Sequence, residues 1–283
     1  MPELPEVEVL ARHLQPRLPG QRIRDVFVGR AKVVLPDTPA DFRQALLGAT
    51  FTGLSRRGKY FLFELRRPKT CEPFTLLGHL GMTGRMYLAR KKSPLPKHAA
   101  VVLDLGRDVF IYEDTRYFGR LTLDLTSVAG LGPEPLSEDF QPKPFQAALR
   151  RSEQAIKIKL LDQSLVAGVG NIYASEALFR ARISPKRPAS RLTTAQVEKL
   201  WAAIREVLTE AIACGSTIPL NLAGSGPGGL FYFGLAAGAP DYYEERLRVY
   251  DRAGQPCPNC GRPIKRIVQA ARSTFFCAHC QTK

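Results

Sequence analysis

Four cysteines near the C-terminus constrain the fold more than any other feature of the sequence. They form two C-x₂-C pairs separated by sixteen residues: Cys257 and Cys260, then Cys277 and Cys280. Four thiolates at this spacing can bind one tetrahedral Zn²⁺, whereas two disulfides would require an oxidising compartment. We therefore predict one structural zinc ion. The segment between the pairs is typical of a β-hairpin with its turn near residues 270–272, which places Arg272 near the tip.

Short apolar or alternating runs dominate the first half of the chain. Turn residues separate eight of them, at 22–29, 50–58, 60–66, 74–80, 84–89, 99–105, 108–114 and 120–125. Only residues 5–18 and 39–48 carry a helical spacing in this half. Many short strands without intervening helices favour an antiparallel β-sandwich. We assign residues 1–130 to this N-terminal domain.

The second half of the chain is predicted to be helical. Residues 126–150 are rich in Pro, Gly and Ser and indicate a linker. Helical periodicity follows at 153–163, 171–181 and 193–215, with Thr193 or Thr194 as the last helix's N-cap and Gly215 as its C-cap. The glycine-rich apolar stretch within 221–243 indicates a functional loop. We predict an α+β protein with a helical domain at 131–245 and a zinc finger at 246–283.

The charge balance points to a polyanionic partner. The 283 residues include 41 Lys and Arg against 26 Asp and Glu, a formal net charge of +15. Nucleic acid is the leading candidate and a membrane surface is the rival. The sequence has neither an apolar run of transmembrane length nor a signal-peptide pattern. We expect an intracellular protein without a membrane partner.

The first residues, M-P-E-L-P, permit covalent chemistry. Removal of Met1 would leave Pro2 as a secondary amine with a pKa near ~8, so more of it is unprotonated at neutral pH than of a lysine. The carboxylate of Glu3 could move protons beside it, and an amine next to an acid can form a Schiff base with a sugar carbon. The alternative is that Pro5 only starts a helix, and the residues alone favour that alternative.

Weaker motifs indicate contact with DNA. The run Gly168-Val-Gly170-Asn171 resembles a turn whose backbone N–H groups and Asn cap face a phosphate, although an ordinary helix start would have the same pattern. Three stretches, at 56–60, 79–84 and 114–119, bring polar or basic residues and a glycine to strand ends. Their Met82, Arg116 and Phe118 could together unstack a duplex. Taken singly, Met82 and Phe118 would be core residues and Arg116 would form a surface ion pair.

In these motifs the chain resembles the bacterial formamidopyrimidine-DNA glycosylases, which repair oxidised purines in DNA. The resemblance covers nearly the whole length, in the family's order. Its motifs are P-E-L-P-E-V-E at 2–8, R-R-G-K-Y at 56–60, H-L-G-M-T-G at 79–84, D-T-R-Y-F-G at 114–119, L-L-D-Q at 160–163, V-A-G-V-G-N-I-Y-A-S-E-A-L-F at 166–179 and the four-cysteine finger. Tyr117 departs from the pattern, since the family usually has a basic residue there.

The resemblance implies a fold and a set of residue roles. The fold is a β-sandwich, a helix–two-turn–helix domain and a zinc hairpin that bind double-stranded DNA. The Pro2 nitrogen would attack the sugar C1′ with Glu3 as general acid and base. Lys59 would assist β-elimination and Arg272 would assist δ-elimination. Met82, Arg116 and Phe118 would fill the gap left by a flipped nucleotide. Further positions match residues that touch DNA: His98, Lys157, Asn171 and Tyr173.

The resemblance favours a monomeric, cytoplasmic, nucleoid-associated enzyme that excises 8-oxoguanine and formamidopyrimidines and cleaves abasic sites. One alternative is the related endonuclease VIII branch, which acts on oxidised pyrimidines. That branch usually begins P-E-G-P-E, and Leu4 disfavours it. The other is a catalytically silent, zinc-dependent protein that binds damaged DNA. Such a protein would have discarded Pro2, Glu3 or Lys59, all of which are present.

Overall fold

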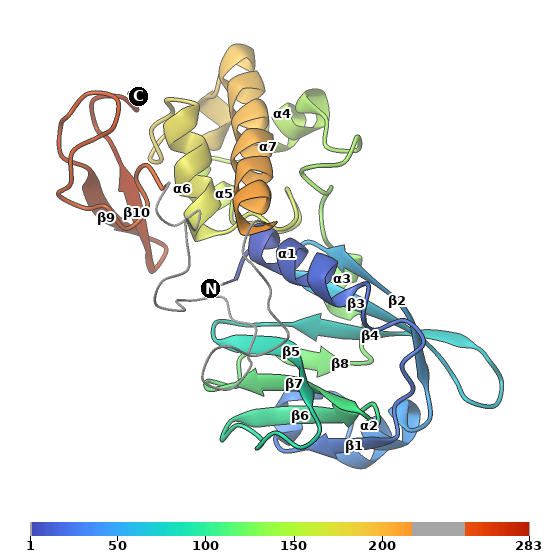
Figure 1. Cartoon of the computed structure of the whole chain (residues 1–283). Coiled ribbons are helices and arrows are strands. Elements are labelled where there is room, and N and C mark those ends of the chain that lie inside the picture. The colour runs from blue at the N-terminus through green and yellow to red at the C-terminus, as the bar shows by residue number, and fades with distance from the viewer. Residues whose placement is uncertain (1, 217–246, 283) are drawn as a thin grey trace. The chain divides into compact units, whose positions relative to one another are not determined.

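The computed structural model describes residues 2–216 and 247–282 and divides them into two compact units (Figure 1). The first unit contains Pro2 and residues 6–129. The second contains residues 3–5, 130–215 and 247–282. The loop predicted within 221–243 lies outside the described residues. No helix in the described ranges has the length and apolar character needed to cross a membrane.

The first unit is built on two four-stranded antiparallel sheets, which confirms the predicted sandwich. One sheet has the order β1-β6-β7-β5 and the other β2-β3-β4-β8. The inward-facing side chains form one apolar core, in which Phe63 packs edge-on against Phe110 of the other sheet. The strands are β1 (Asp25–Val28), β2 (Thr50–Arg57), β3 (Tyr60–Arg66), β4 (Pro73–His79), β5 (Gly84–Arg90), β6 (Ala99–Asp104), β7 (Asp108–Asp114) and β8 (Arg120–Thr122).

Short helices complete this unit: α1 (Leu4–Leu14), whose first two residues belong to the second unit, η1 (Ala31–Val33), α2 (Pro39–Leu46) and α3 (Thr126–Ala129). Helix α1 ends two residues before Pro16, because a proline has no N–H for the helix and disfavours a helical residue before it. Thr38 caps α2, since its hydroxyl accepts a hydrogen bond from the Asp41 N–H at 3.1 Å.

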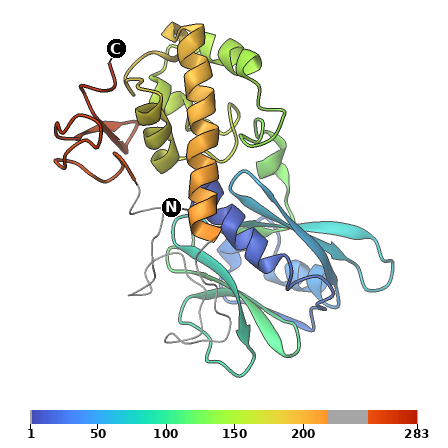
Figure 2. The same cartoon turned by 45° about the horizontal axis from the view of Figure 1, so that its top comes forward.

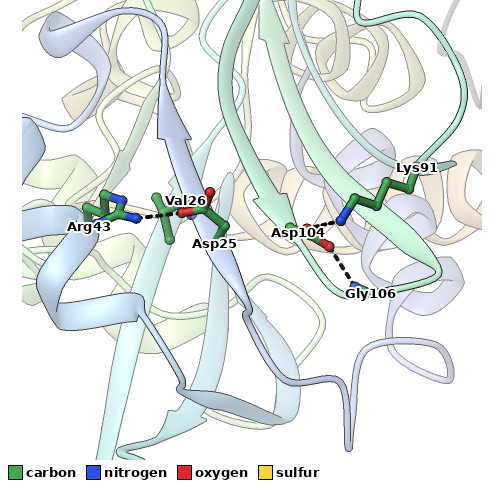
Figure 3. Close-up of polar contacts among 6 residues, drawn as sticks. All are labelled: Asp25, Val26, Arg43, Lys91, Asp104 and Gly106. Carbon is green, nitrogen blue, oxygen red and sulfur yellow. Dashed lines mark hydrogen bonds and ion pairs between the residues drawn. The ribbon is translucent and has the colours of Figure 1, made fainter.

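Ion pairs at the surface involve the edge strand β1 and the end of β6 (Figure 3). Arg43 of α2 donates to Asp25 at 2.8 Å. Lys91 donates to Asp104 at 2.5 Å, and the N–H of Gly106 donates to the same carboxylate at 2.7 Å. Surface pairs of this kind contribute little to stability, so the apolar core holds the sandwich together.

The second unit contains α4 (Pro142–Arg150), α5 (Ile156–Lys159), α6 (Asn171–Arg180), η2 (Ala189–Arg191) and the 23-residue α7 (Thr194–Ser216). Helices α6 and α7 lie side by side (Figures 1 and 2), and Arg180 pairs with Glu210 at 2.6 Å. Thr193 caps α7 as predicted: its hydroxyl accepts from the Gln196 N–H, and its own N–H donates to the Gln196 side chain. The predicted C-cap at Gly215 is wrong, because α7 continues to Ser216.

The linker predicted for residues 126–150 is also wrong, since α3 and α4 lie within it. Pro142 stands in the first turn of α4, where its missing N–H costs nothing. Phe140 and Phe145 are buried, with ring centroids 5.1 Å apart, and Trp201 of α7 donates to the Phe140 carbonyl at 2.7 Å. The predicted helix at 153–163 is reduced to the single turn of α5.

The C-terminal hairpin forms as predicted from strands β9 (Lys265–Gln269) and β10 (Arg272–Phe276). Ala270 and Ala271 make its two-residue turn, both with positive φ, at 46° and 59°. This backbone twist matches that of the flanking strands, although glycine or asparagine would adopt it more easily. Arg272 is the first residue after the turn.

Candidate functional site

The carboxylate of Glu3 is buried at the N-terminus of α6. Its two oxygens accept hydrogen bonds from the N–H groups of Ile172, at 2.9 Å, and Tyr173, at 3.3 Å. Only 1% of the residue is exposed. The first N–H groups of a helix have no partner within it and carry a partial positive charge, so they suit a carboxylate.

Two glycines make room for this arrangement. A Cβ on Gly170 would overlap the Glu3 carboxylate, so only glycine fits there. Gly168 has φ +86°, and a Cβ there would lie 2.5 Å from a methyl carbon of Leu4. The Leu4 N–H donates to the Gly168 carbonyl at 3.1 Å. The G-V-G-N motif therefore holds the N-terminal segment of the chain itself. Asn171 is the first residue of α6 and not its cap.

Asn171 is bonded to the predicted site residue Lys157 and to the zinc hairpin. Lys157 of α5 donates to the Asn171 Oδ1 atom at 2.5 Å, and the Asn171 Nδ2 atom donates to the Ser273 carbonyl of β10 at 2.9 Å. Lys157 is fully buried. The pKa of its ammonium is lowered to about 8: burial is the main cause, the charge of Glu3 opposes it, and the charge of Arg272 adds to it. These contacts bring α5, α6 and the zinc hairpin into one polar cluster.

Tyr250 also belongs to this cluster, although no sequence motif predicted it. It hydrogen-bonds to the Asn171 side chain, and burial raises the pKa of its phenol. The buried carboxylate of Glu176 positions it by accepting from the N–H groups of residues 248, 249 and 250 at 2.9, 3.0 and 2.8 Å. The signal in the sequence was a tyrosine within the basic run R-V-Y-D-R directly before the finger.

The four predicted zinc ligands converge. Their sulfur atoms all lie within 4.8 Å of one another, and none is in a disulfide. The Sγ atoms of Cys260 and Cys277 are 3.5 Å apart, and those of Cys257 and Cys280 are 3.9 Å apart. A tetrahedral Zn²⁺ with Zn–S bonds of about 2.3 Å requires separations of about 3.8 Å. The site therefore fits one structural zinc ion.

The first unit carries the remaining candidates. Lys59 is largely buried in the turn between β2 and β3. Arg56 shapes this turn: it donates to the Gly58 carbonyl at 3.0 Å and pairs with Glu8 of α1 at 2.6 Å. His79, at the end of β4, stacks on Tyr60 with ring centroids 4.7 Å apart. Burial lowers the pKa of His79 to about 4, and the charge of Lys59 adds to the effect. Pro2 is grouped with this unit.

Three exposed side chains project from two neighbouring loops of the same unit. Met82 is 44% exposed and Phe118 is 48% exposed, so the reading of these two as core residues is wrong. Arg116 lies 4.7 Å above the Phe118 ring. The interpretation of Arg116 taken singly had predicted a surface ion pair instead. Exposed apolar side chains flanked by a cation suit a surface that inserts between stacked bases.

Tyr117 lies between two polar neighbours. Its hydroxyl contacts the His98 Nδ1 atom at 3.1 Å, and Arg30 lies 4.9 Å above its ring. Lys32 lies 5.8 Å from the Phe118 ring. Sequence reasoning missed Arg30 and Lys32, whose only signal was their basic character. The structure thus groups His98, Arg116 and Phe118 in one unit, and Glu3, Lys157, Asn171, Tyr173 and Arg272 in the other.

Three family models match the chain. They are the formamidopyrimidine-DNA glycosylase N-terminal domain at residues 1–121, the H2TH domain of the same glycosylases at 113–220, and a zinc finger found in FPG and IleRS at 254–283. A formamidopyrimidine-DNA glycosylase from Symbiobacterium thermophilum is 44% identical over 99% of this chain and 89% of its own length.

Solved structures agree with the family models. A Lactococcus lactis relative bound to DNA containing an AP site has a TM-score of 0.85 and 35% identity, with 99% of this chain and 100% of that chain covered. A G226P mutant of the L. lactis protein, in complex with DNA containing Fapy-dG, has a TM-score of 0.86 and 36% identity, with both chains fully covered. The chain belongs to the formamidopyrimidine-DNA glycosylase family and, as a member, is a base-excision-repair DNA glycosylase.

Proposed function

We propose that this enzyme is bifunctional: it excises oxidised purines from double-stranded DNA and then cleaves the abasic site through a Schiff base on Pro2. The observation that supports this most directly is the position of Glu3. Its carboxylate is fixed by two backbone N–H groups, and it is the covalent neighbour of Pro2. A carboxylate held in this position can transfer protons while the neighbouring Pro2 amine reacts at the sugar carbon.

The first chemical steps use these two residues. The Pro2 nitrogen forms a bond to C1′ as the bond from C1′ to the damaged base breaks, and the base leaves with the bonding electron pair and a proton. The Pro2 nitrogen gives up its own proton while the C1′–O4′ bond breaks and O4′ is protonated. An iminium ion results, with Glu3 as the acid and base. Removal of a C2′ proton then expels the 3′ phosphate.

Two cations assist the elimination steps in this proposal. Lys59 assists β-elimination, in which the developing negative charge is on the 3′ phosphate. Arg272 assists δ-elimination at the 5′ phosphate from the tip of the zinc hairpin. The zinc ion, held by the four cysteines, keeps that hairpin folded. Its role here is structural.

The remaining site residues hold the DNA. We assign Met82, Arg116 and Phe118 to the gap that a flipped nucleotide leaves, with Arg116 facing the unpaired base. Contacts to the DNA are assigned to His98, Asn171 and Tyr173, and a supporting role is assigned to Lys157. Since Lys157 is buried, it acts by holding Asn171 and by its charge.

The substrate preference follows the purine branch of the family. L. lactis relatives were crystallised with DNA containing Fapy-dG and with DNA containing an AP site. Leu4 is completely buried against Gly168, so the glycine typical of the pyrimidine branch would leave a void. We therefore propose 8-oxoguanine and formamidopyrimidines as the substrates. We expect a monomer that works in the bacterial cytoplasm, on the nucleoid.

Borohydride trapping tests the mechanism. Reduction of the iminium should join the protein covalently to duplex DNA that contains 8-oxoguanine, formamidopyrimidine or a plain abasic site. A Pro2→Gly variant should lose most of this adduct, and Glu3→Gln should trap on the abasic site but not on the damaged bases. If the enzyme without Met1 forms no adduct on any of these DNAs, the Schiff-base mechanism is wrong. A panel that adds oxidised pyrimidines tests the substrate class.

A further inference from the structure

A buried carboxylate lies beneath the loops that carry Met82, Arg116 and Phe118. Asp114 ends strand β7 and has no exposed surface. Its side chain accepts from the Thr83 hydroxyl at 2.6 Å, from the Arg116 N–H at 3.1 Å and from the Gly119 N–H at 2.9 Å. The Tyr112 hydroxyl donates to it at 3.3 Å, and the Phe118 N–H is also a donor. One carboxylate thus bonds to both loops.

The two loops are in direct backbone contact at this point. A Cβ on Gly81 would lie 2.5 Å from the Gly119 nitrogen, and a Cβ on Gly119 would overlap the Tyr112 hydroxyl. The Gly81 N–H also donates to the His79 Nδ1 atom at 3.2 Å. Neither loop can therefore move far without breaking bonds to the other or to the end of β4.

This bonding determines where the exposed side chains point. The N–H groups of Arg116 and Phe118 turn inward to the carboxylate, and their side chains project outward. Met82 is the neighbour of Thr83, which the carboxylate holds in the other loop. Exposed apolar side chains on a free loop would collapse onto the nearest apolar surface. Charge-assisted hydrogen bonds from a fixed strand end resist that collapse.

We propose that Asp114 is the positioning residue of the damage-probing loops. It holds Met82, Arg116 and Phe118 in their inserting arrangement before DNA binds, so that opening of the damaged pair does not require the loops to order first. This inference rests on the proposed role of those three side chains. Asp114 itself is buried, so in this proposal it acts through the two loops and not by contact with the DNA.

Asp114→Asn is the sharpest test, because it keeps the shape and removes the charge. The new NH₂ group is a donor, and whichever way the amide turns it faces a backbone N–H or a hydroxyl that also donates. Insertion can be followed in stopped flow by the fluorescence of a 2-aminopurine next to an 8-oxoguanine pair. We expect insertion and single-turnover excision to slow at least tenfold. Cleavage of an abasic site in single-stranded DNA, which needs no insertion, should change less than twofold.

Three further variants make the result specific. Asp108→Asn, at the other end of β7, removes a carboxylate that pairs with Arg90 at the surface and should leave insertion unchanged. Thr83→Val removes one of the bonds to Asp114 and should slow insertion by a smaller factor. Combined with Asp114→Asn it should add almost nothing, because both act through the same carboxylate.

Two outcomes would overturn the proposal. One is insertion by Asp114→Asn at the wild-type rate. The other is an equal loss of insertion and single-strand cleavage with a lowered melting temperature, which would make Asp114 a general stability residue. The variants Phe118→Ala and Met82→Ala distinguish a failure of the Asp114 proposal from a failure of the proposed function. If these two variants also insert normally while trapping persists, the assignment of the probing side chains is at fault.

Discussion

The side-chain amide of Asn171 donates to the backbone carbonyl of Ser273 at 2.9 Å, so the first residue of α6 is bonded to the second residue of β10. The same amide accepts from Lys157. A loss of structure in the zinc hairpin would therefore disturb the helical cluster around Asn171, and the reverse also holds. Arg272 adjoins Ser273 in the chain, so this bond also helps to fix the tip of the hairpin.

Zinc removal should weaken DNA binding through this link. Without metal the four thiolates lose their common ligand, β10 loosens and the carbonyl of Ser273 leaves Asn171. We expect one zinc per chain by elemental analysis. After chelation, affinity for abasic-site DNA should fall at least ~10-fold, equivalent to about 1.4 kcal/mol. Asn171→Ala should reproduce part of the loss with zinc retained. Unchanged affinity of the metal-free protein would contradict the link.

Gly170→Ala should inactivate the enzyme without abolishing DNA binding. The new methyl group would overlap the Glu3 carboxylate and push it off the N–H groups of α6. A displacement of this size near the reacting atoms reduces a rate by roughly 100-fold. Single-turnover excision measures the effect, and gel-shift affinity should change little. Gly130→Ala, where a Cβ meets nothing within 4 Å, is the matched control.

Lys157 should impose a pH dependence on stability in the alkaline range. Burial lowers its pKa from 10.5 to about 8 in the folded state. Between these values the unfolded chain binds more protons, so this residue makes the free energy of unfolding rise with pH, by roughly 3 kcal/mol at most. Lys157→Met should flatten that rise in urea denaturation measured from pH 8 to 10.5. An identical slope in both proteins would refute the assignment.

Protonation of His79 should destabilise the first unit at acidic pH. Its pKa falls from 6.5 to about 4, chiefly by burial and then by the charge of Lys59. The unfolded chain therefore binds more protons between these values, and stability decreases as pH falls from 6.5 to 4. His79→Gln keeps an acceptor for the Gly81 N–H but cannot be protonated. Its melting temperature should fall less steeply than that of the wild type over this range.

The strands were predictable because their apolar runs are short and turn residues separate them. Residues 60–66 form a short, mostly apolar run, and β3 has the predicted bounds, with every second residue buried. The prediction for residues 126–150 was wrong because their composition resembles that of a linker. Pro142 is a good first residue for a helix, and Phe140 and Phe145 find buried partners only in the folded chain. Local composition does not contain that tertiary contact.

The candidate site was predictable in its residues more than in their contacts. The spacing of the cysteines identifies the metal ligands without a structure, because both pairs must reach one ion. Glu3 could be singled out beside Pro2, but its hydrogen-bond partner Ile172 is 169 residues away. Tyr250 carried no local signal of comparable strength, and Asp114 stood out only as the first residue of the D-T-R-Y-F-G motif. Their roles follow from which backbone N–H groups and amides meet them in the folded protein.

The anchoring of Glu3 on α6 has a consequence for biosynthesis. The first residues to leave the ribosome include Pro2 and Glu3, but the N–H groups that hold Glu3 belong to residues 172 and 173. At ordinary translation rates the carboxylate waits roughly 10 to 30 s for them. Under the proposed mechanism, an unfinished chain therefore has the Pro2 amine without its fixed acid. Competence for base excision begins only after most of the polypeptide has been made.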